Sequence, residues 1–294
     1  MLLVRQRAPW YFRCVRHAID QDWRGSHFAW SLIERAHRHF GILDQCAPLA
    51  IDDTETVLMP LYWPSLVRKN RLPDYERHQI AAFAEAIDRL GSGVTLLDCG
   101  ADVGLFTRLL LRRTHRIASV IAIEPNPRSH FILSCNLRGL HVPAKAILGA
   151  VSDLDGWATL HAADYNEGDH ARFITPGTGD TRVVHLDGLG LPRDCPIALK
   201  IDVEGEELNV IRGARETLTT VPAFAVQIEA NVDVVRRTSV DPGMIVKAIQ
   251  EVRPVSLTVI HDHRGVVGTS LDTSRPFFSQ YPGLQSCDII MSTA

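Results

Sequence analysis

Apolar residues along most of the chain follow two alternating patterns, short unbroken runs and longer stretches with a helical period. From residue 73 onward, each short run, typical of a buried strand, is followed by a stretch whose apolar positions lie three or four residues apart. Within residues 74–90, for example, Ile80, Phe83 and Ile87 fall on one stripe. We expect strands at 94–99, 117–124, 144–151, 196–202, 223–229, 255–261 and 287–291, and helices at 74–90, 104–113, 128–140, 204–218 and 241–252.

Two parts of the chain lack this alternation. Residues 1–72 carry most of the tryptophans, mixed with Arg, His and interrupting prolines. We interpret them as a partly helical extension that precedes the main domain at 73–294. The polar, glycine-rich stretch 164–180 is too irregular for a core element, and long insertions of this kind often act as lids.

Strands that alternate with helices predict a Rossmann-like α/β fold, a mostly parallel sheet with helices on both faces. Ligands of such sheets bind beyond the carboxyl ends of the strands. Nearly every predicted strand ends there in an ionisable residue. The candidate site residues that this rule selects are Asp98, Glu124, Ala150–Asp153, Asp202, Glu229 and His261.

The turn after the first of these strands indicates the class of ligand. Gly100 and Gly104 allow a tight turn, and Glu124 follows 20 residues after Gly104, where a carboxylate can accept both hydroxyls of a ribose. A dinucleotide would place its pyrophosphate at the next helix N-terminus. Here Asp98 and Asp102 flank that position, the turn holds no Lys or Arg, and the third glycine of G-x-G-x-x-G is missing. The turn therefore suits the ammonium and sulfonium of S-adenosylmethionine better than a phosphate.

Four segments resemble the FkbM family of methyltransferases. They are LDCGADVGLFT at 97–107, AIEPNP at 122–127, KIDVEGEE at 200–207 and IRGA at 211–214. KIDVEG is the most specific of them, and Tyr75–Glu76, Asn136 and Leu186–Asp187 also match, so the resemblance covers residues 73–292. It implies a class I, S-adenosylmethionine-dependent methyltransferase. Family members mostly methylate hydroxyls of sugars, polyketides and other secondary metabolites.

The resemblance also implies which residues contact the cofactor. They follow the strands of the domain and comprise Asp98, Gly100, Ala101, Asp102, Gly104, Phe106, Glu124, Pro125, Asn126, Ser152, Asp153 and Asp202. Alternatively, strand-end carboxylates cap nearby helices, and residues 152–156 also read as a turn. The sequence departs from the family at Asp102, where Asn is more common. Residues 1–72 lie outside the resemblance, so we expect them to affect acceptor choice or form a homodimer contact.

Methyl transfer to a hydroxyl requires a group that accepts its proton. Asp202 ends the strand that faces the transferred methyl in this fold, and Glu229 and His261 end later strands on the same rim. These three are the candidate catalytic residues. Glu204 also follows the fourth strand, although it would favour the first turn of its helix as well. Mg²⁺ needs a near-octahedral set of oxygen ligands, so with two carboxylates we favour a metal-free base and expect no metal site.

Lys200 lies on the same face of its predicted strand as Asp202, because strand side chains alternate with a period of two. A buried lysine needs an anionic partner. We therefore expect an ion pair between the two residues rather than a catalytic lysine.

Composition narrows the partners and the compartment. The formal net charge of −3 argues against nucleic acid as a partner. No apolar run approaches the ~20 residues that span a bilayer, no signal peptide is evident, and the six cysteines form no CxxC pair. We therefore expect a cytoplasmic enzyme that acts on a small hydroxyl acceptor. The alternatives are an NAD-dependent oxidoreductase and a methyltransferase-like scaffold without turnover.

Overall fold

The computed structural model describes residues 46–60, 72–162 and 172–293, and the chain divides into two compact units, Met1–Tyr75 and Glu76–Ala294. The described part of the first unit contains an antiparallel hairpin of β1 (Cys46–Ala50) and β2 (Thr56–Pro60), and the 3-10 turn η1 (Leu72–Asp74). Residues 46–60 of the partly helical extension that we predicted for residues 1–72 thus form strands, and the helical part of that extension stays a prediction. Its remainder, with the homodimer contact, lies outside the described residues.

Local chemistry accounts for the hairpin. Val57 and Met59 are buried and alternate with more exposed neighbours, which is the period of a strand. The Asp52 carboxylate accepts hydrogen bonds from the backbone N–H groups of Thr54 and Glu55 at 2.8 and 2.9 Å, and so closes the turn between the strands. The pattern is only five residues long, and the aromatic and basic residues around it hide it in the sequence.

The second unit alternates strands and helices, as we predicted from residue 73 onward. In chain order its elements are α4 (Arg77–Leu90), β3 (Val94–Cys99), α5 (Leu105–Leu111), β4 (Ile117–Glu124), α6 (Pro127–Leu137), β5 (Ala144–Leu148), β6 (Ala150–Val151), β7 (Gly156–Ala162), β8 (Arg172–Pro176), β9 (Thr181–Val184), η2 (Leu186–Leu189), β10 (Ile197–Ile201), α7 (Glu207–Arg212), α8 (Arg215–Thr220), β11 (Phe224–Asn231), α9 (Val232–Thr238), α10 (Pro242–Gln250), β12 (Ser256–His261), β13 (Gly265–Gly268), α11 (Phe277–Gln280) and β14 (Ser286–Ser292). None of the helices in the described ranges combines the length and apolarity needed to cross a membrane.

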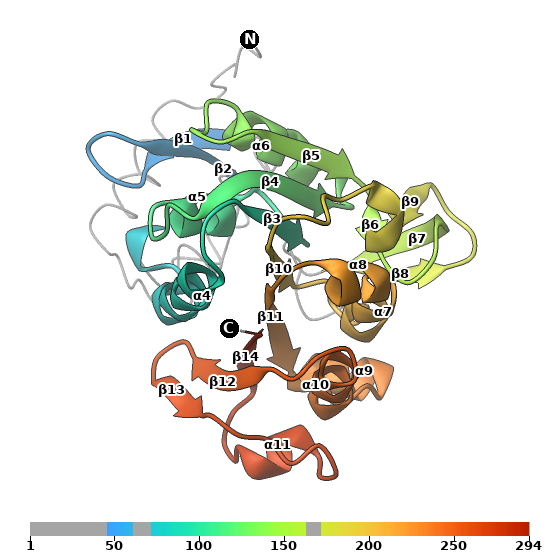
Figure 1. The fold of residues 1–294 in the computed structure, drawn as a ribbon. Helices are drawn as coiled ribbons and strands as arrows, with labels where there is room; N and C mark the ends of the chain where they lie inside the picture. Colours follow the sequence, from blue (N-terminus) through green and yellow to red (C-terminus); the bar gives the residue numbers. More distant parts are fainter. Residues whose placement is uncertain (1–45, 61–71, 163–171, 294) are drawn as a thin grey trace, which may run out of the picture. The chain divides into compact units, whose positions relative to one another are not determined.

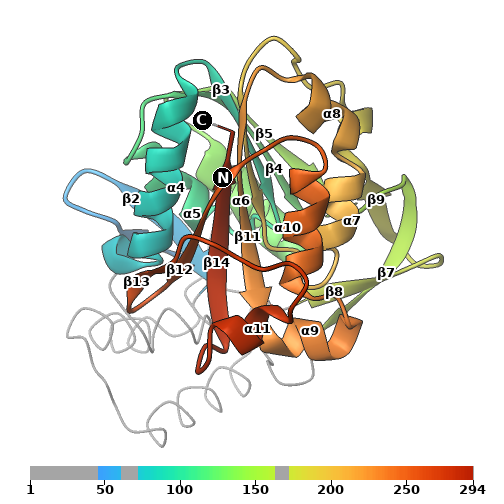
Figure 2. The same cartoon turned by 60° about the horizontal axis from the view of Figure 1, so that its bottom comes forward.

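Eight strands form the main sheet, in the order β13-β12-β14-β11-β10-β3-β4-β5 (Figure 1). Strands β5, β4, β3, β10 and β11 are parallel, whereas β14 is antiparallel to both of its neighbours. Helices α4 and α5 lie on one side of this sheet and α7 and α10 on the other (Figure 2). The predicted α/β class is confirmed. The chain leaves β3 towards β4 and β5 and resumes at β10 on the other side of β3, so the ends of β3 and β10 form the switch point where such sheets bind ligands.

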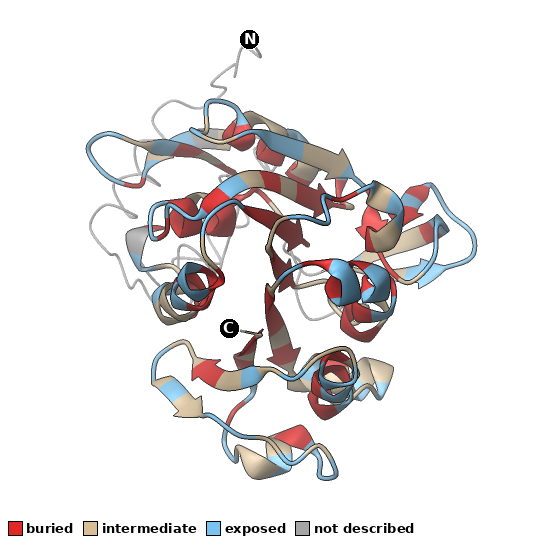
Figure 3. Cartoon of the chain, viewed as in Figure 1, coloured by how far each residue is buried: buried red, intermediate tan, exposed pale blue. Residues whose placement is uncertain are grey.

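The three central strands are buried on both faces, but the two faces differ in chemistry (Figure 3). On the face towards α7 and α10, apolar residues join one large core cluster, among them Leu97, Leu199 and Val226. On the opposite face, Asp98, Lys200 and Gln227 are direct neighbours in the register of β3, β10 and β11. All three are buried, at 0%, 6% and 1% exposure. A polar row therefore crosses the sheet beneath α4 and α5.

Two predicted elements are interrupted, and one region was misassigned. The run 144–151 divides into β5 of the main sheet and β6, which joins a second sheet in the order β6-β9-β7-β8. The helix predicted at 204–218 divides into α7 and α8, because the Asp187 carboxylate accepts the N–H groups of Glu216 and Thr217 and starts α8 anew. Residues 172–176, which we expected to be irregular, form β8 and pair with β7. Residues 163–171 lie outside the description, so the lid stays a prediction.

Among the glycines that the structure describes, Gly100 leaves the least room for a side chain. It has a φ of +77°, and a Cβ there would lie 1.8 Å from the Asp202 carbonyl oxygen at the end of β10. We predict that Gly100→Ala lowers the free energy of unfolding, measured by urea denaturation, by about 3–5 kcal/mol. Gly93 also has a positive φ but open space around it, so Gly93→Ala should cost only about 1–2 kcal/mol. Equal losses in the two variants would show that the close approach of β3 and β10 is not a constraint.

Candidate functional site

The turn after β3 is anchored on β4. The backbone N–H groups of Gly100 and Ala101 both donate to the Ile123 carbonyl oxygen, at 3.0 and 3.1 Å. Asp102 and Gly104 then adopt left-handed conformations, with φ of 45° and 81°. The backbone thereby reverses within five residues and directs α5 back over the sheet, as the glycines predicted.

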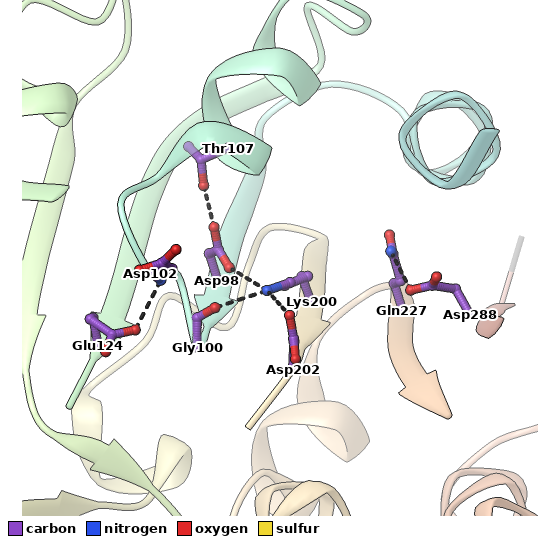
Figure 4. Close-up of polar contacts among 9 residues, drawn as sticks. All are labelled: Asp98, Gly100, Asp102, Thr107, Glu124, Lys200, Asp202, Gln227 and Asp288. Atoms are coloured by element: carbon purple, nitrogen blue, oxygen red, sulfur yellow. Dashed lines mark hydrogen bonds and ion pairs between the residues drawn. The ribbon is translucent and has the colours of Figure 1, made fainter. Parts of the chain in front are cut away.

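Glu124 joins this turn to the one that follows β4. Its two carboxylate oxygens accept the backbone N–H of Asp102 at 2.9 Å and the backbone N–H of Asn126 at 2.8 Å (Figure 4 shows the first). The Asn126 side chain in turn caps α6 by accepting the N–H of Arg128. Burial, followed by the nearby Asp102 carboxylate, raises the pKa of Glu124 to about 8, although the two backbone hydrogen bonds oppose the rise.

Lys200 occupies the centre of the switch point (Figure 4). Its ammonium donates to the Gly100 carbonyl oxygen at 2.9 Å and to Asp202 Oδ2 at 3.0 Å, and it lies 3.6 Å from Asp98 Oδ1. Burial alone would lower the pKa of Lys200, but the Asp202 and Asp98 carboxylates raise it above its ordinary value. The expected ion pair between Lys200 and Asp202 is confirmed, and the same ammonium also ties the turn after β3 to the end of β10.

Asp98 is fully buried between this ammonium and α5. Its Oδ2 accepts a hydrogen bond from the Thr107 hydroxyl, while Oδ1 has no hydrogen-bond partner among the described residues. Phe106, the preceding residue of α5, packs its ring 5.6 Å from the Lys200 ammonium and 6.3 Å from the ring of Phe83. Phe106 thus covers the polar row on the side of the sheet where α5 lies.

Three carboxyl groups converge near the carboxyl ends of β10 and β11, where Glu229 lies two residues before the last residue of β11. Asp202, Glu204 and Glu229, here called the carboxylate cluster, each place an oxygen within 4.8 Å of the other two. Burial raises the pKa of Glu229 well above its ordinary value, and the nearby Asp202 and Glu204 carboxylates raise it further. Burial and Asp202 also raise the pKa of Glu204 to about 7. Glu204 lies in the turn before α7 rather than in the helix, so its carboxyl is not used to favour a helix N-terminus.

Asp288 is a member of the site that the sequence analysis missed. It lies on β14 directly opposite Glu229 in the register of β11, and it accepts a hydrogen bond from the Gln227 amide at 2.9 Å (Figure 4). Burial raises the pKa of Asp288 to about 7. Cys287–Met291 was predicted to be a strand, but nothing local to it indicates that the strand inserts beside β11.

His261 ends β12, which β14 separates from β11. Its ring is 6.0 Å from that of His263, and burial and the nearby Arg264 lower its pKa. In the described part of the chain no hydrogen bond or ion pair joins His261 to the carboxylate cluster. The structure therefore brings together Asp202 and Glu229 of the three candidate catalytic residues.

Ser152 and Asp153 follow β6, in a segment that begins beside the end of β4. The segment starts at Gly149, whose N–H donates to the Glu124 carbonyl oxygen at 3.1 Å. The Ser152 hydroxyl donates to Glu206 Oε2 at 2.5 Å and so ties this turn to the start of α7. Pro125 lies partly buried between Glu124 and Asn126. The predicted cofactor residues thus lie at the carboxyl ends of β3, β4, β6 and β10 or in the segments that follow them.

A family model of the FkbM methyltransferase domain matches residues 98–251, from the buried Asp98 to the end of α10. The chain belongs to the FkbM methyltransferase family. Its fold is the Rossmann-like fold of class I methyltransferases, with the last strand, β14, inserted antiparallel into the sheet. No curated protein matches the chain in sequence.

Solved structures of methyltransferases are similar to this FkbM chain at low identity. One of them is described as methyltransferase FkbM from Methylobacillus flagellatus, and it is 15% identical with a TM-score of 0.44. The match covers 91% of this chain but only 62% of the length of that one. A geranyl diphosphate methyltransferase in complex with GPP and sinefungin is 11% identical with a TM-score of 0.41, over 74% of this chain and 76% of that one. The plantazolicin methyltransferase BpumL bound to S-adenosylhomocysteine is 10% identical with a TM-score of 0.37, over 97% and 99% of the two chains. These likenesses are too distant to indicate a substrate or a mechanism.

Lys200 should be a large contributor to stability, because its removal leaves buried carboxylates without a counter-charge. We predict that Lys200→Met lowers the free energy of unfolding by about 3–5 kcal/mol. Lys145 is exposed on the edge strand β5, so the same change at Lys145 should stay within about 0.5 kcal/mol. Urea denaturation of both variants measures the difference. A loss at Lys200 no larger than the loss at Lys145 would contradict the central role of this ammonium.

Proposed function

We propose that this FkbM chain transfers a methyl group from S-adenosylmethionine to a hydroxyl group of a small molecule, a sugar or a secondary metabolite. One arrangement carries the proposal. A carboxylate suited to a ribose at the end of β4 and the carboxylate cluster at the ends of β10 and β11 flank the turn after β3. When bound, S-adenosylmethionine supplies a methyl group activated by its sulfonium. The chain's own residues then have to align the acceptor, exclude water and take up one proton.

The described residues fit this cofactor. Asp98 Oδ1 is a buried acceptor that forms an ion pair with Lys200 at 3.6 Å but no hydrogen bond among them, so it keeps the capacity to accept a hydrogen bond from an ammonium group. Each Glu124 oxygen accepts one backbone N–H and keeps a second lone pair for a ribose hydroxyl. Following the family pattern, we extend the proposed cofactor contacts to the other predicted residues: Gly100, Ala101, Asp102, Gly104, Phe106, Pro125, Asn126, Ser152, Asp153 and Asp202.

The two alternative functions fit these groups less well. A pyrophosphate needs a positive or amide-lined site, but the Lys200 ammonium beside the turn is already surrounded by three protein oxygens. This disfavours an NAD-dependent oxidoreductase. Crowded, partly buried carboxyl groups lower the stability of the fold, and in a scaffold without turnover nothing would offset the cost of the carboxylate cluster. Such a cost is typical of a site that acts on a ligand.

We assign proton uptake to Asp202. The Lys200 ammonium at 3.0 Å favours the ionised form of Asp202, which can accept the proton of the acceptor hydroxyl. Burial raises the pKa of Glu229, which hydrogen-bonds with Asp202, and the protonated form of Glu229 can donate a hydrogen bond to the acceptor. Lys200 and Arg237 each pair with one member of the cluster, so two protein cations already offset its charge. We therefore keep the metal-free mechanism.

Cofactor binding tests the first half of the proposal. We predict that calorimetry detects micromolar-range binding of S-adenosylhomocysteine and no binding of NAD. Glu124→Ala should weaken that binding by about 1.5–3 kcal/mol, the scale of hydrogen bonds to a charged group. Because ribose hydroxyls donate to the ionised carboxylate, wild-type affinity should also rise with pH up to the Glu124 pKa of about 8.

The matched control is Glu251→Ala, which removes an exposed carboxylate at the end of α10 and should leave the affinity unchanged. Wild-type affinity in Glu124→Ala, or tight binding of NAD, would overturn the assignment of the cofactor site.

Proton transfer tests the second half. We predict that Asp202→Asn slows single-turnover methyl transfer from labelled S-adenosylmethionine to a panel of methyl glycosides by about 10²-fold or more. Glu229→Gln keeps a hydrogen-bond donor and should cost less, and His261→Ala should have the smallest effect. EDTA should leave all rates unchanged.

If EDTA abolishes wild-type turnover and Mg²⁺ restores it, the metal-free base is wrong and a metal ion activates the acceptor hydroxyl instead. Full activity of Asp202→Asn would place the chemistry elsewhere.

A further inference from the structure

The turn between β10 and α7, which carries Glu204, is held from the side by α9. The Arg237 guanidinium donates to the Glu204 carbonyl oxygen at 2.6 Å and lies 3.5 Å from Glu204 Oε2. Glu204 itself has a φ of 55°, a left-handed conformation that residues with a side chain adopt at a cost. The hydrogen bond to its carbonyl oxygen therefore stabilises a strained backbone next to the carboxylate cluster.

The next residue shows how tightly α9 packs on this turn. Gly205 has a φ of +121°, and a Cβ there would lie 2.8 Å from Thr238 Cγ2 and 3.7 Å from an Arg237 nitrogen. The turn and α9 thus approach to a distance that only glycine permits. The position of the Glu204 carboxyl depends on where α9 holds Arg237.

Arg237 also reaches the second sheet. Its guanidinium carbon lies 4.7 Å from the centre of the Phe173 ring on β8, which is cation–π distance. Phe173 pairs with His161 of β7 in the register, and the two rings stack at 5.1 Å with 22° between their planes. A continuous set of contacts therefore runs from the β7–β8 hairpin through Arg237 to Glu204.

Charge gives this contact a chemical consequence. Burial and Asp202 raise the pKa of Glu204 to about 7, and Arg237 opposes the rise. The other titratable groups that face Glu204 are Glu207 at the start of α7 and Glu229 on β11. Arg237 is thus the basic side chain that offsets a set of carboxyl groups around Glu204.

We propose that Arg237 is a positioning residue of the acceptor site, which holds the Glu204 carboxyl in the carboxylate cluster and links it to the β7–β8 hairpin through Phe173. This positioning role rests on the proposed function, because only that function makes the carboxylate cluster an acceptor site. It makes the hairpin, which lies outside the main sheet, a determinant of acceptor binding. Substitutions on β8 would then alter which acceptor binds, while the turn after β3 stays the same.

The test follows the Glu204 carboxyl directly and needs no acceptor. The full chain is labelled with ¹³C at the Glu carboxyl carbons, and the Glu204 resonance is assigned with Glu204→Gln. In the wild type the resonance should titrate near pH 7. In Arg237→Gln the titration should move up by about one pH unit or more, because the opposing cation is lost. Arg237→Lys keeps the positive charge, so the Glu204 titration in this variant should stay close to that of the wild type.

Two matched controls separate this role from a general effect on folding. Arg236→Gln removes a cation from the same helix, but one that pairs with Asp233 at the surface, and should leave the Glu204 titration unchanged. Phe173→Leu should shift it by a smaller amount than Arg237→Gln, whereas Trp157→Leu, at an exposed ring of the same sheet, should not. If Arg237→Gln does not fold, Arg237→Lys and Phe173→Leu decide the test.

The two proposals fail separately. An unchanged Glu204 titration in folded Arg237→Gln and Phe173→Leu overturns the positioning role. Equal shifts in Arg236→Gln overturn it as well, because the effect would then be one of net charge. Binding of S-adenosylhomocysteine to Arg237→Gln should stay within about twofold of wild type, and a loss as large as that in Glu124→Ala would also contradict the role. Absence of such binding in the wild type would instead overturn the proposed function and leave the titration result intact.

Discussion

The rest of the site depends on the contacts between the buried Lys200 ammonium and the oxygens around it. Lys200 lies in the central strand, in register with Asp98 on one side and Gln227 on the other, and a buried charge there has no access to water. Only oxygens of the protein can replace its hydration. Asp98, the Gly100 carbonyl and Asp202 do so, and in doing so they bring the turn after β3 against the end of β10. The close contact that requires glycine at position 100 follows from the same constraint.

A second consequence is an excess of carboxyl groups over cations at the carboxyl edge of the sheet. Glu124, Glu204 and Asp288 all have a pKa raised to between about 7 and about 8, first by burial and then by a neighbouring carboxylate, which is Asp102 for Glu124 and Asp202 for the other two. Lys200 and Arg237 offset part of this charge from the two sides of the turn that follows β10. Such an edge favours a cationic ligand and hydroxyl donors over phosphates, which agrees with the FkbM family and with the function proposed here.

Much of this arrangement could be predicted because it is local in the sequence. The strands around 94–99 and 117–124 and the glycine turn between β3 and α5 each depend on a few consecutive residues. The same holds for the start of α10, where the Asp241 side chain accepts the Gly243 N–H. Likewise, the pairing of Lys200 with Asp202 follows from the period of two along one strand. The hairpin at 46–60 and strand β8 were missed, because a short, half-exposed strand leaves too brief a pattern to distinguish it from a loop.

By itself, the sequence determined the fold class, the family and the carboxylates near the carboxyl ends of β3, β4, β10 and β11, since strand periodicity and turn chemistry act over a few residues. Only the tertiary structure decided which carboxyl groups meet. Asp288 enters the site because β14 inserts antiparallel beside β11, and Glu204 turns into the cluster because α9 packs on its turn. His261 stays apart, since β14 lies between its strand and β11. Pairing between distant strands depends on the free energy of the whole sheet, which no local pattern encodes.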